Sequence, residues 1–125
     1  MLTTAGRDFV AAQIGGTATT ATAQYMAITT DAAAASAADT TLASEETTNG
    51  LGRLVGTYAH STSTATYTIT RLFTYSGSSS KVIAKVGLFT AASAGTLVFE
   101  TVLGTTATLS ASGDTLTITQ TVTLS

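Results

Sequence analysis

The sequence predicts a mainly β protein, either an antiparallel β-sandwich or a small barrel of about five to seven strands, with a short N-terminal helix and an extended Ala/Thr-rich arm. Thirty of the 125 residues are threonine, whose branched side chain favours extended backbone. In the C-terminal segment threonine alternates with apolar side chains, which indicates one hydrated and one buried strand face. Gly/Ser/Thr-rich turns separate the strand segments of the second half, as is typical of antiparallel sheets.

The first predicted element is a helix over Leu2 to Ile14. Thr3 or Thr4 can cap its N-terminus, because a side-chain oxygen there accepts a hydrogen bond from a free backbone N–H group. The pair Gly15-Gly16 ends the helix. Its apolar side is sparse, so a helix this short needs a surface on which to lie.

The rest of the first half has little to bury. An Ala/Thr-rich segment is followed by a predicted first strand at 25–30. Two short helices are predicted behind aspartate caps, at 31–38 and 39–46. Because such short pieces are marginal in water, we expect residues 1–50 to form an N-terminal helix and extended arm that a partner surface organises.

Residues 51–125 are predicted to form a separate antiparallel β domain. Its strand segments are 53–59, 64–75, 81–89, 96–103 and 114–125. In the second of these, Arg71 interrupts the apolar side and Leu72 the polar side, and a β-bulge there would resolve the conflict. The segments 76–80 and 104–113 are predicted as loops.

A hairpin is predicted between the third and fourth of these strands. Leu88 and Phe89 lie on opposite faces of the strand, so one anchors the core while the other can reach a second layer or a neighbour. Gly87 gives room at a crowded point, and Gly95 permits the positive φ that the turn requires.

Composition argues against several classes of function. Seven acidic and five basic residues give a net charge of −2, so we expect no nucleic-acid partner. No apolar run approaches the roughly 20 residues that cross a bilayer, so we expect no membrane partner. Without cysteine, disulfides and thiolate metal sites cannot form. The N-terminus lacks a basic start followed by an apolar run, so secretory export is not expected.

Few residues could carry chemistry. His60 is the only histidine, and its neighbour Ser61 would point the opposite way on a strand, so no catalytic triad is predicted. Glu45 and Glu46 could flank a metal ion or an arginine, but we interpret them as a solvated helix end. We therefore expect no enzyme activity, no cofactor and no metal.

Aromatic and large apolar side chains are the remaining candidates for binding a partner. Tyrosine is enriched at interface hot spots. An uncharged, proline-free sheet also suits contact with copies of itself or with a larger lattice. The candidate interface residues are Leu2, Phe9, Tyr25, Leu42, Tyr58, Tyr67, Tyr75 and Phe89.

Four segments of the chain resemble a group of small virion structural proteins of tailed bacteriophages. That group has, in this order, a T-x-A-G-R-D start, a D-T-x-L-x-x-E segment, a G-L-F-x-A-x-x-x-G-T-L hairpin and a G-D-x-L-x-[IV]-T strand. The matching segments here are Leu2–Ala11, Asp39–Glu45 followed by Arg53, Val86–Leu97 and Gly113–Thr119. Many of these proteins carry a tryptophan just before the hairpin, where Lys85-Val86 stands in this sequence.

The resemblance implies a virion structural protein that is made in the host cytoplasm. Our first expectation is a capsid decoration (cement) protein on the outer surface of the head. Its partners would then be the major capsid protein and copies of itself, as a homotrimer. The alternative is a tail-fibre or receptor-binding module that contacts a host receptor or glycan through its tyrosines and the two predicted loops.

Overall fold

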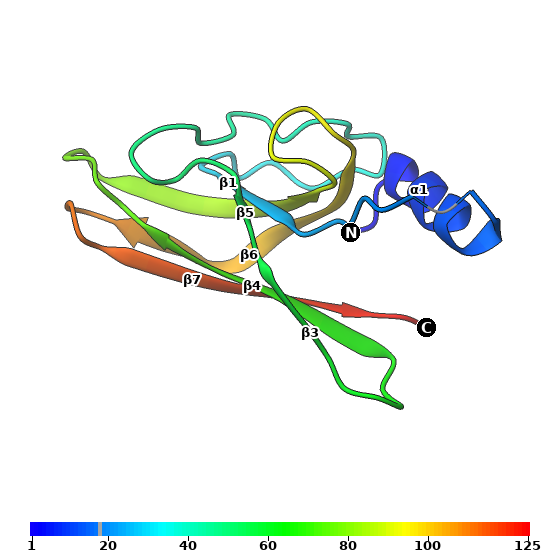
Figure 1. Ribbon diagram of the computed structural model, residues 1–125. Helices are drawn as coiled ribbons and strands as arrows, with labels where there is room; N and C mark the ends of the chain where they lie inside the picture. Colours follow the sequence, from blue (N-terminus) through cyan, green and yellow to red (C-terminus); the bar gives the residue numbers. More distant parts are fainter. Residues whose placement is uncertain (18) are drawn as a thin grey trace.

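The computed structural model describes residues 1–17 and 19–125, which form one helix and seven strands (Figure 1). The protein is mainly β, as the sequence predicts. The helix is α1 (Thr4–Gly15). The strands are β1 (Tyr25–Thr29), β2 (Leu54–Val55), β3 (Thr57–His60), β4 (Thr66–Thr74), β5 (Lys81–Phe89), β6 (Leu97–Leu109) and β7 (Thr115–Thr123).

The strands of the described chain form two antiparallel sheets that pack as an open sandwich and do not close into a barrel. Sheet A has four strands in the order β2-β1-β5-β6. Sheet B has three strands in the order β3-β4-β7. Figure 1 shows β1 and β5 in one layer, with β4 and β7 in the layer below. The structure thus decides between the two architectures that the sequence leaves open.

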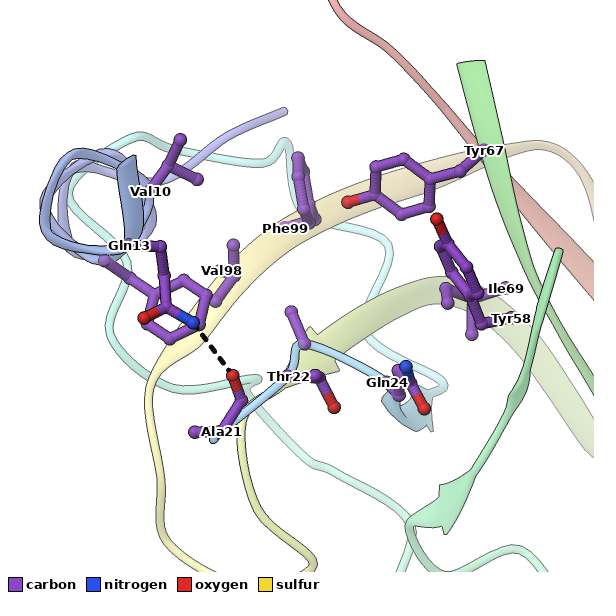
Figure 2. Close-up of a pocket in the computed structure, with 12 residues that line it drawn as sticks. Val10, Gln13, Ala21, Thr22, Gln24, Tyr58, Tyr67, Ile69, Val98 and Phe99 are labelled. Carbon is purple, nitrogen blue, oxygen red and sulfur yellow. Dashed lines mark hydrogen bonds between the residues drawn. The ribbon is translucent and has the colours of Figure 1, made fainter. Parts of the chain in front are cut away.

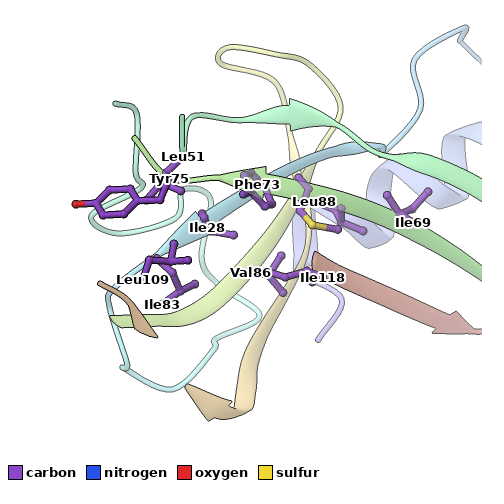
Figure 3. Packing of buried hydrophobic residues seen from close by; sticks show 11 residues of the cluster. Ile28, Leu51, Ile69, Phe73, Tyr75, Ile83, Val86, Leu88, Leu109 and Ile118 are labelled. Carbon is purple, nitrogen blue, oxygen red and sulfur yellow. The ribbon is translucent and has the colours of Figure 1, made fainter. Parts of the chain in front are cut away.

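The main hydrophobic core lies between the sheets (Figure 3). Its central side chains are Ile28, Val86 and Leu88 from sheet A and Ile69, Phe73 and Ile118 from sheet B. On β7, Ile118 and Val122 are buried while the threonines are exposed, which confirms the predicted alternation. Burial of these side chains fixes which face of each strand points inward.

Gly56 carries the chain from sheet A to sheet B. The sequence predicts one strand over 53–59, but the structure divides it into β2 in sheet A and β3 in sheet B. A Cβ atom on Gly56 would lie 2.4 Å from Cγ2 of Ile69, so glycine is required at this close approach. The Gly56 N–H group donates to the Gln24 carbonyl at 2.7 Å, which fixes the crossing point.

The chain between β1 and β2 forms a third layer on the outer face of sheet A (Figure 1). The buried cluster between this layer and sheet A consists of Leu42 from the layer and Ala27, Phe89 and Leu97 from the sheet. β1, from the predicted arm (1–50), lies in sheet A between β2 and β5, which belong to the predicted β domain (51–125). In this structure, the surface that organises the first half is the chain's own sheet.

The two helices predicted at 31–38 and 39–46 do not form, and this stretch consists of turns and irregular backbone. Asp31 accepts a hydrogen bond from the Ala33 N–H group at 3.2 Å, and Asp39 accepts one from Ser36 at 3.1 Å. Such local side-chain bonds compete with helical hydrogen bonding. The aspartates thus stabilise turns here and do not cap helices.

Two strands differ from their predicted form. β4 pairs with β7 without a register shift, so the predicted bulge at Arg71-Leu72 is wrong. Leu72 is half exposed on the outer face, and Arg71 donates to the Val55 carbonyl at 3.3 Å from the inner side. β6 continues to Leu109 through most of the predicted loop at 104–113, with a register shift against β5.

Candidate partner-binding cleft

An apolar cleft lies where α1, sheet A and sheet B meet (Figure 2). Its central cavity has a volume of about 210 Å³. The lining side chains come from α1 (Phe9, Val10, Gln13), from residues 21–24, from β3 and β4 (Tyr58, Tyr67, Ile69) and from β6 (Val98, Phe99). Within the described chain, no Asp, Glu, Lys or Arg side chain lines it. The cavity therefore suits an apolar or aromatic group.

β6 holds α1 beside this cavity. Thr3 caps the helix by accepting a hydrogen bond from the Gly6 N–H group at 2.9 Å, which confirms one of the two predicted caps. The Thr3 N–H group donates to the Val98 carbonyl at 3.0 Å. Gly6 lies so close to β6 that a Cβ atom on it would be 2.3 Å from the Val98 oxygen. Close backbone contact thus positions the helix beside the sheet.

Tyr58 and Tyr67 form the opposite wall. Their ring centroids are 5.7 Å apart and their planes are tilted by 44°. Tyr58 is 51% exposed, whereas Tyr67 is partly buried. Burial, followed by the proximity of Tyr58, raises the pKa of Tyr67. A tyrosine hydroxyl is already protonated at neutral pH without any shift, so Tyr67 has a hydrogen to donate to a group bound in the cleft.

Gln13 ties the segment that follows α1 back to the helix. Its Nε2 donates to the Ala21 carbonyl at 3.0 Å, as Figure 2 shows. Its Oε1 accepts a hydrogen bond from the Thr19 N–H group at 2.6 Å. One amide side chain thus fixes the segment that forms part of the cavity wall.

A second cavity of about 300 Å³ adjoins the first. The two cavities share Val10, Tyr67 and Phe99, so they lie side by side, and together they are called the cleft. The second is completed by Met1, Leu2 and residues 120–124 at the end of β7. Leu124 is 64% exposed at its margin.

The structure separates the eight candidate interface residues into groups. Leu2, Phe9, Tyr58 and Tyr67 line the cleft. Leu42 and Phe89 are buried beneath the third layer, with Tyr25 packed against them. Tyr75 is buried in the main core, and its hydroxyl donates to the Ser79 carbonyl. Sequence reasoning missed Val10 and Phe99, whose only signal is that they are apolar residues within the predicted helix and the predicted strand at 96–103.

Arg53 organises the third layer. Its guanidinium donates to both carboxylate oxygens of Glu45, at 2.7 and 3.1 Å. It also donates to the carbonyls of Ala91 and Ala94, at 2.9 and 2.7 Å. Glu45 is therefore paired with an arginine, which was the alternative that we did not favour. The only sequence signal for this contact is the position of Arg53 after the second motif.

The next residue, Glu46, also forms a salt bridge and is buried. Its carboxylate lies 3.1 Å from Nζ of Lys81, and the residue is 8% exposed. Since neither glutamate lies in a helix, the interpretation as a solvated helix end is wrong. Glu46 instead attaches the third layer to β5 through Lys81, whereas the pair of Glu45 with Arg53 joins two parts of that layer.

A buried lysine lies beneath the same layer. Nζ of Lys85 is 2.8 Å from Asp31 and 3.1 Å from Glu100, and Lys85 is 2% exposed. Burial lowers the pKa of Lys85, but the hydrogen bonds to Asp31 and Glu100 outweigh it and leave this pKa raised. Burial, followed by a hydrogen bond with Asp39, raises the pKa of Glu100. The cation thus fills the space among these carboxylates.

Other chemistry is sparse. His60 is exposed on β3, and its Nδ1 lies 2.8 Å from the Thr66 carbonyl oxygen. Residues 1–17 and 19–125 contain no group of three or more His, Cys, Asp or Glu side chains that could hold a metal ion. Over the same residues, no helix has the length and apolar character to span a membrane.

The fold is thus a small β-sandwich with an apolar cleft between α1 and the two sheets. No protein-family model and no curated protein matches the chain in sequence. The cleft and the four sequence motifs are therefore the features of the molecule that bear on its function.

Proposed function

We propose that this protein is a virion structural protein that decorates the outside of a phage head and stabilises the assembled shell. The observation that carries the proposal is the apolar cleft, because it gathers Leu2, Phe9, Tyr58 and Tyr67 from separate parts of the chain. The motif resemblance supports the major capsid protein as the partner. A single aromatic or aliphatic side chain of the shell would fit a cavity of about 210 Å³.

The mechanism is thermodynamic linkage. A protein that binds the assembled shell, and not its dissociated subunits, stabilises assembly by the free energy of its own binding. At a free concentration about 100 times the dissociation constant, this amounts to about 2.7 kcal/mol per site. Many sites on one particle add together, so each site can be weak.

The test compares particles with and without the protein. Particles that lack it should release their contents at a lower temperature, and adding the purified protein back should restore heat resistance. The Tyr58→Ala variant should bind particles at least about tenfold more weakly, because it removes an aromatic wall of the cleft. Unchanged heat resistance after complete removal of the protein would contradict the proposal.

The matched control is Leu72→Ala. Leu72 is 50% exposed and Tyr58 is 51% exposed, and both residues lie on sheet B. Leu72 lies on the outer face of β4, away from the cleft, so its truncation should leave particle binding unchanged. Equal loss of binding in the two variants would show that the cleft is not the contact.

A tail-fibre or receptor-binding module is the second candidate. It is favoured by Tyr58, an exposed aromatic ring beside Tyr67, because such rings can stack on sugars. Copy number separates the two functions, since a head decoration protein is present in far more copies than a tail module. Glycan or host-cell binding by the purified protein, lost in Tyr58→Ala, would support the tail function.

A further inference from the structure

β7 is an edge strand of sheet B. Along its outer side, no strand of the described chain forms backbone hydrogen bonds with it. β7 pairs with β4 on one side, and no other strand of the described chain pairs with it. Its residues, TLTITQTVT, include neither a charged residue nor a proline. Natural sheets commonly protect such edges with lysine, proline or a bulge, because an open edge is a template for another strand.

The backbone groups of the odd-numbered residues point toward this edge. Just beyond the end of the strand, the Leu124 N–H group donates to the Ala65 carbonyl at 2.7 Å. Just before its start, the Asp114 carbonyl accepts a hydrogen bond from the Tyr75 N–H group at 2.8 Å. Since the direction of backbone groups alternates along a strand, the even-numbered residues bond to β4. The residues whose N–H and C=O groups face outward are Thr115, Thr117, Thr119, Thr121 and Thr123.

We propose that β7 of one molecule pairs with β7 of a second molecule, antiparallel, about a two-fold axis at Thr119. This register places Thr119 opposite itself, Thr117 opposite Thr121 and Thr115 opposite Thr123. Every outward-facing backbone group of β7 then has a partner, because odd-numbered residues lie opposite odd-numbered residues. The two three-stranded sheets become one continuous six-stranded sheet.

The side chains of β7 suit this register best on the outer face. On the outer face threonine always lies opposite threonine, a pair that can share a hydrogen bond. The molecule already contains one such pair, since the hydroxyl oxygens of Thr70 and Thr119 are 3.1 Å apart. On the inner face Leu116 lies opposite Val122, and Ile118 lies opposite Gln120. Because β7 carries no charge, pairing two copies brings no like charges together along the strand.

The size of the contact predicts a weak dimer. Nine residues span about 31 Å, so a strip about 10 Å wide on each copy buries roughly 600 Å² in total, well under half of the roughly 1,600 Å² that a standard stable interface buries. Dimerisation should therefore depend on concentration.

The resemblance implies a homotrimer, whereas pairing of β7 with β7 uses both outer edges and gives a dimer. The molecular mass in solution therefore distinguishes a dimer from a trimer. The proposal does not require a shell and goes beyond the function proposed above.

The experiment is sedimentation of the full chain from about 10 μM to about 1 mM, with amide hydrogen exchange measured over the same range. We expect a monomer–dimer equilibrium. The amides of Thr117, Thr119 and Thr121 should exchange at least about tenfold more slowly at the highest concentration. The amides of Ile118 and Gln120 should be protected at every concentration, because they bond to β4.

The decisive variant is Thr119→Lys, with Thr70→Lys as its matched control. Thr70 and Thr119 are cross-strand partners, so each substitution removes the same hydroxyl pair and adds the same charge to the same face. In the dimer, residue 119 faces its own copy at about 5.5 Å between Cα atoms. The two copies of residue 70 are three strand spacings apart, about 14 Å. Thr119→Lys should weaken dimerisation at least tenfold more than Thr70→Lys.

A second variant, Thr119→Pro, removes an N–H group that faces outward and leaves the bonds to β4 intact. It should be monomeric and keep the wild-type circular dichroism spectrum. A monomer at all concentrations, a trimer, or a dimer that resists both Thr119→Lys and Thr119→Pro would overturn the proposal. Pairing of β7 with a strand of another protein, without any dimer of this chain, would overturn it as well.

Discussion

The guanidinium carbon of Arg53 lies 3.5 Å from the centroid of the Phe89 ring. The same guanidinium holds Glu45 and two carbonyls of the turn between β5 and β6. One side chain therefore joins the third layer, the end of β5 and the hairpin turn. These are the places of the second and third motifs, so both motifs describe a structural contact that keeps the layer on sheet A.

The Arg53→Met substitution should lower the free energy of unfolding by about 2–4 kcal/mol, because it leaves the Glu45 carboxylate and two carbonyls without their donor. Urea denaturation followed by circular dichroism measures this. The control is Arg7→Met on the exposed side of α1, which should change stability by less than about 0.5 kcal/mol. Similar losses in both variants would show that the contact with Glu45 and Phe89 contributes little.

The Gly6→Ala substitution should destabilise the protein by about 1–3 kcal/mol, because its Cβ would lie 2.3 Å from the Val98 oxygen. The helix must then move away from β6, so limited proteolysis should cut within α1 earlier. Gly15→Ala is the matched control, since nothing lies within 4 Å of its added Cβ atom. It should be neutral or slightly stabilising, and equal protease sensitivity of the two variants would contradict this docking of α1.

The parts of the fold that could be predicted from sequence are those fixed by short-range patterns. The alternation along β7 and the cap at Thr3 each depend on residues within a few positions of one another. The opposite placement of Leu88 and Phe89 follows from the same rule, and the two residues lie in different buried clusters. The surface that Phe89 reaches proved to be another part of the same chain.

The parts that could not be predicted depend on contacts between distant segments. The division of one predicted strand at Gly56 is set by the proximity of Ile69, which the local pattern does not contain. The path of residues 30–53 is held by Leu42, Arg53 and Lys85 against sheet A. The cleft likewise arises only when α1, β4 and β6 are packed together.

The buried Lys85 cluster should give stability a non-monotonic dependence on pH. The hydrogen bond from Lys85, followed by that from the Ala33 N–H group, holds the pKa of Asp31 below its ordinary value. Stability from this carboxylate is therefore present above its unfolded pKa and is lost as pH falls through the folded pKa. The pKa of Glu100 is raised, so its ionisation opposes folding and its protonation relieves that opposition.

We therefore expect stability to rise as pH falls from neutral toward the ordinary pKa of a glutamate, and to decrease below the ordinary pKa of an aspartate. Urea midpoints at a series of pH values and constant ionic strength measure this profile. Glu100→Gln should remove the rise, and Asp31→Asn should reduce the loss in acid. Asp8→Asn, on the exposed side of α1, should reproduce the wild-type shape. A wild-type profile in Glu100→Gln would contradict this assignment.

Substitutions at two neighbouring residues of β4 test which face of the strand points into the core. Phe73 is fully buried in the main core, whereas Leu72 is 50% exposed on the outer face. Phe73→Ala should cost about 3–5 kcal/mol, because it removes buried area and leaves a cavity. Leu72→Ala should change stability by less than about 0.5 kcal/mol. Chemical denaturation of both variants measures the difference. A bulge at Arg71-Leu72 would re-aim the residues after it, so comparable costs in the two variants would contradict the regular pairing of β4 with β7.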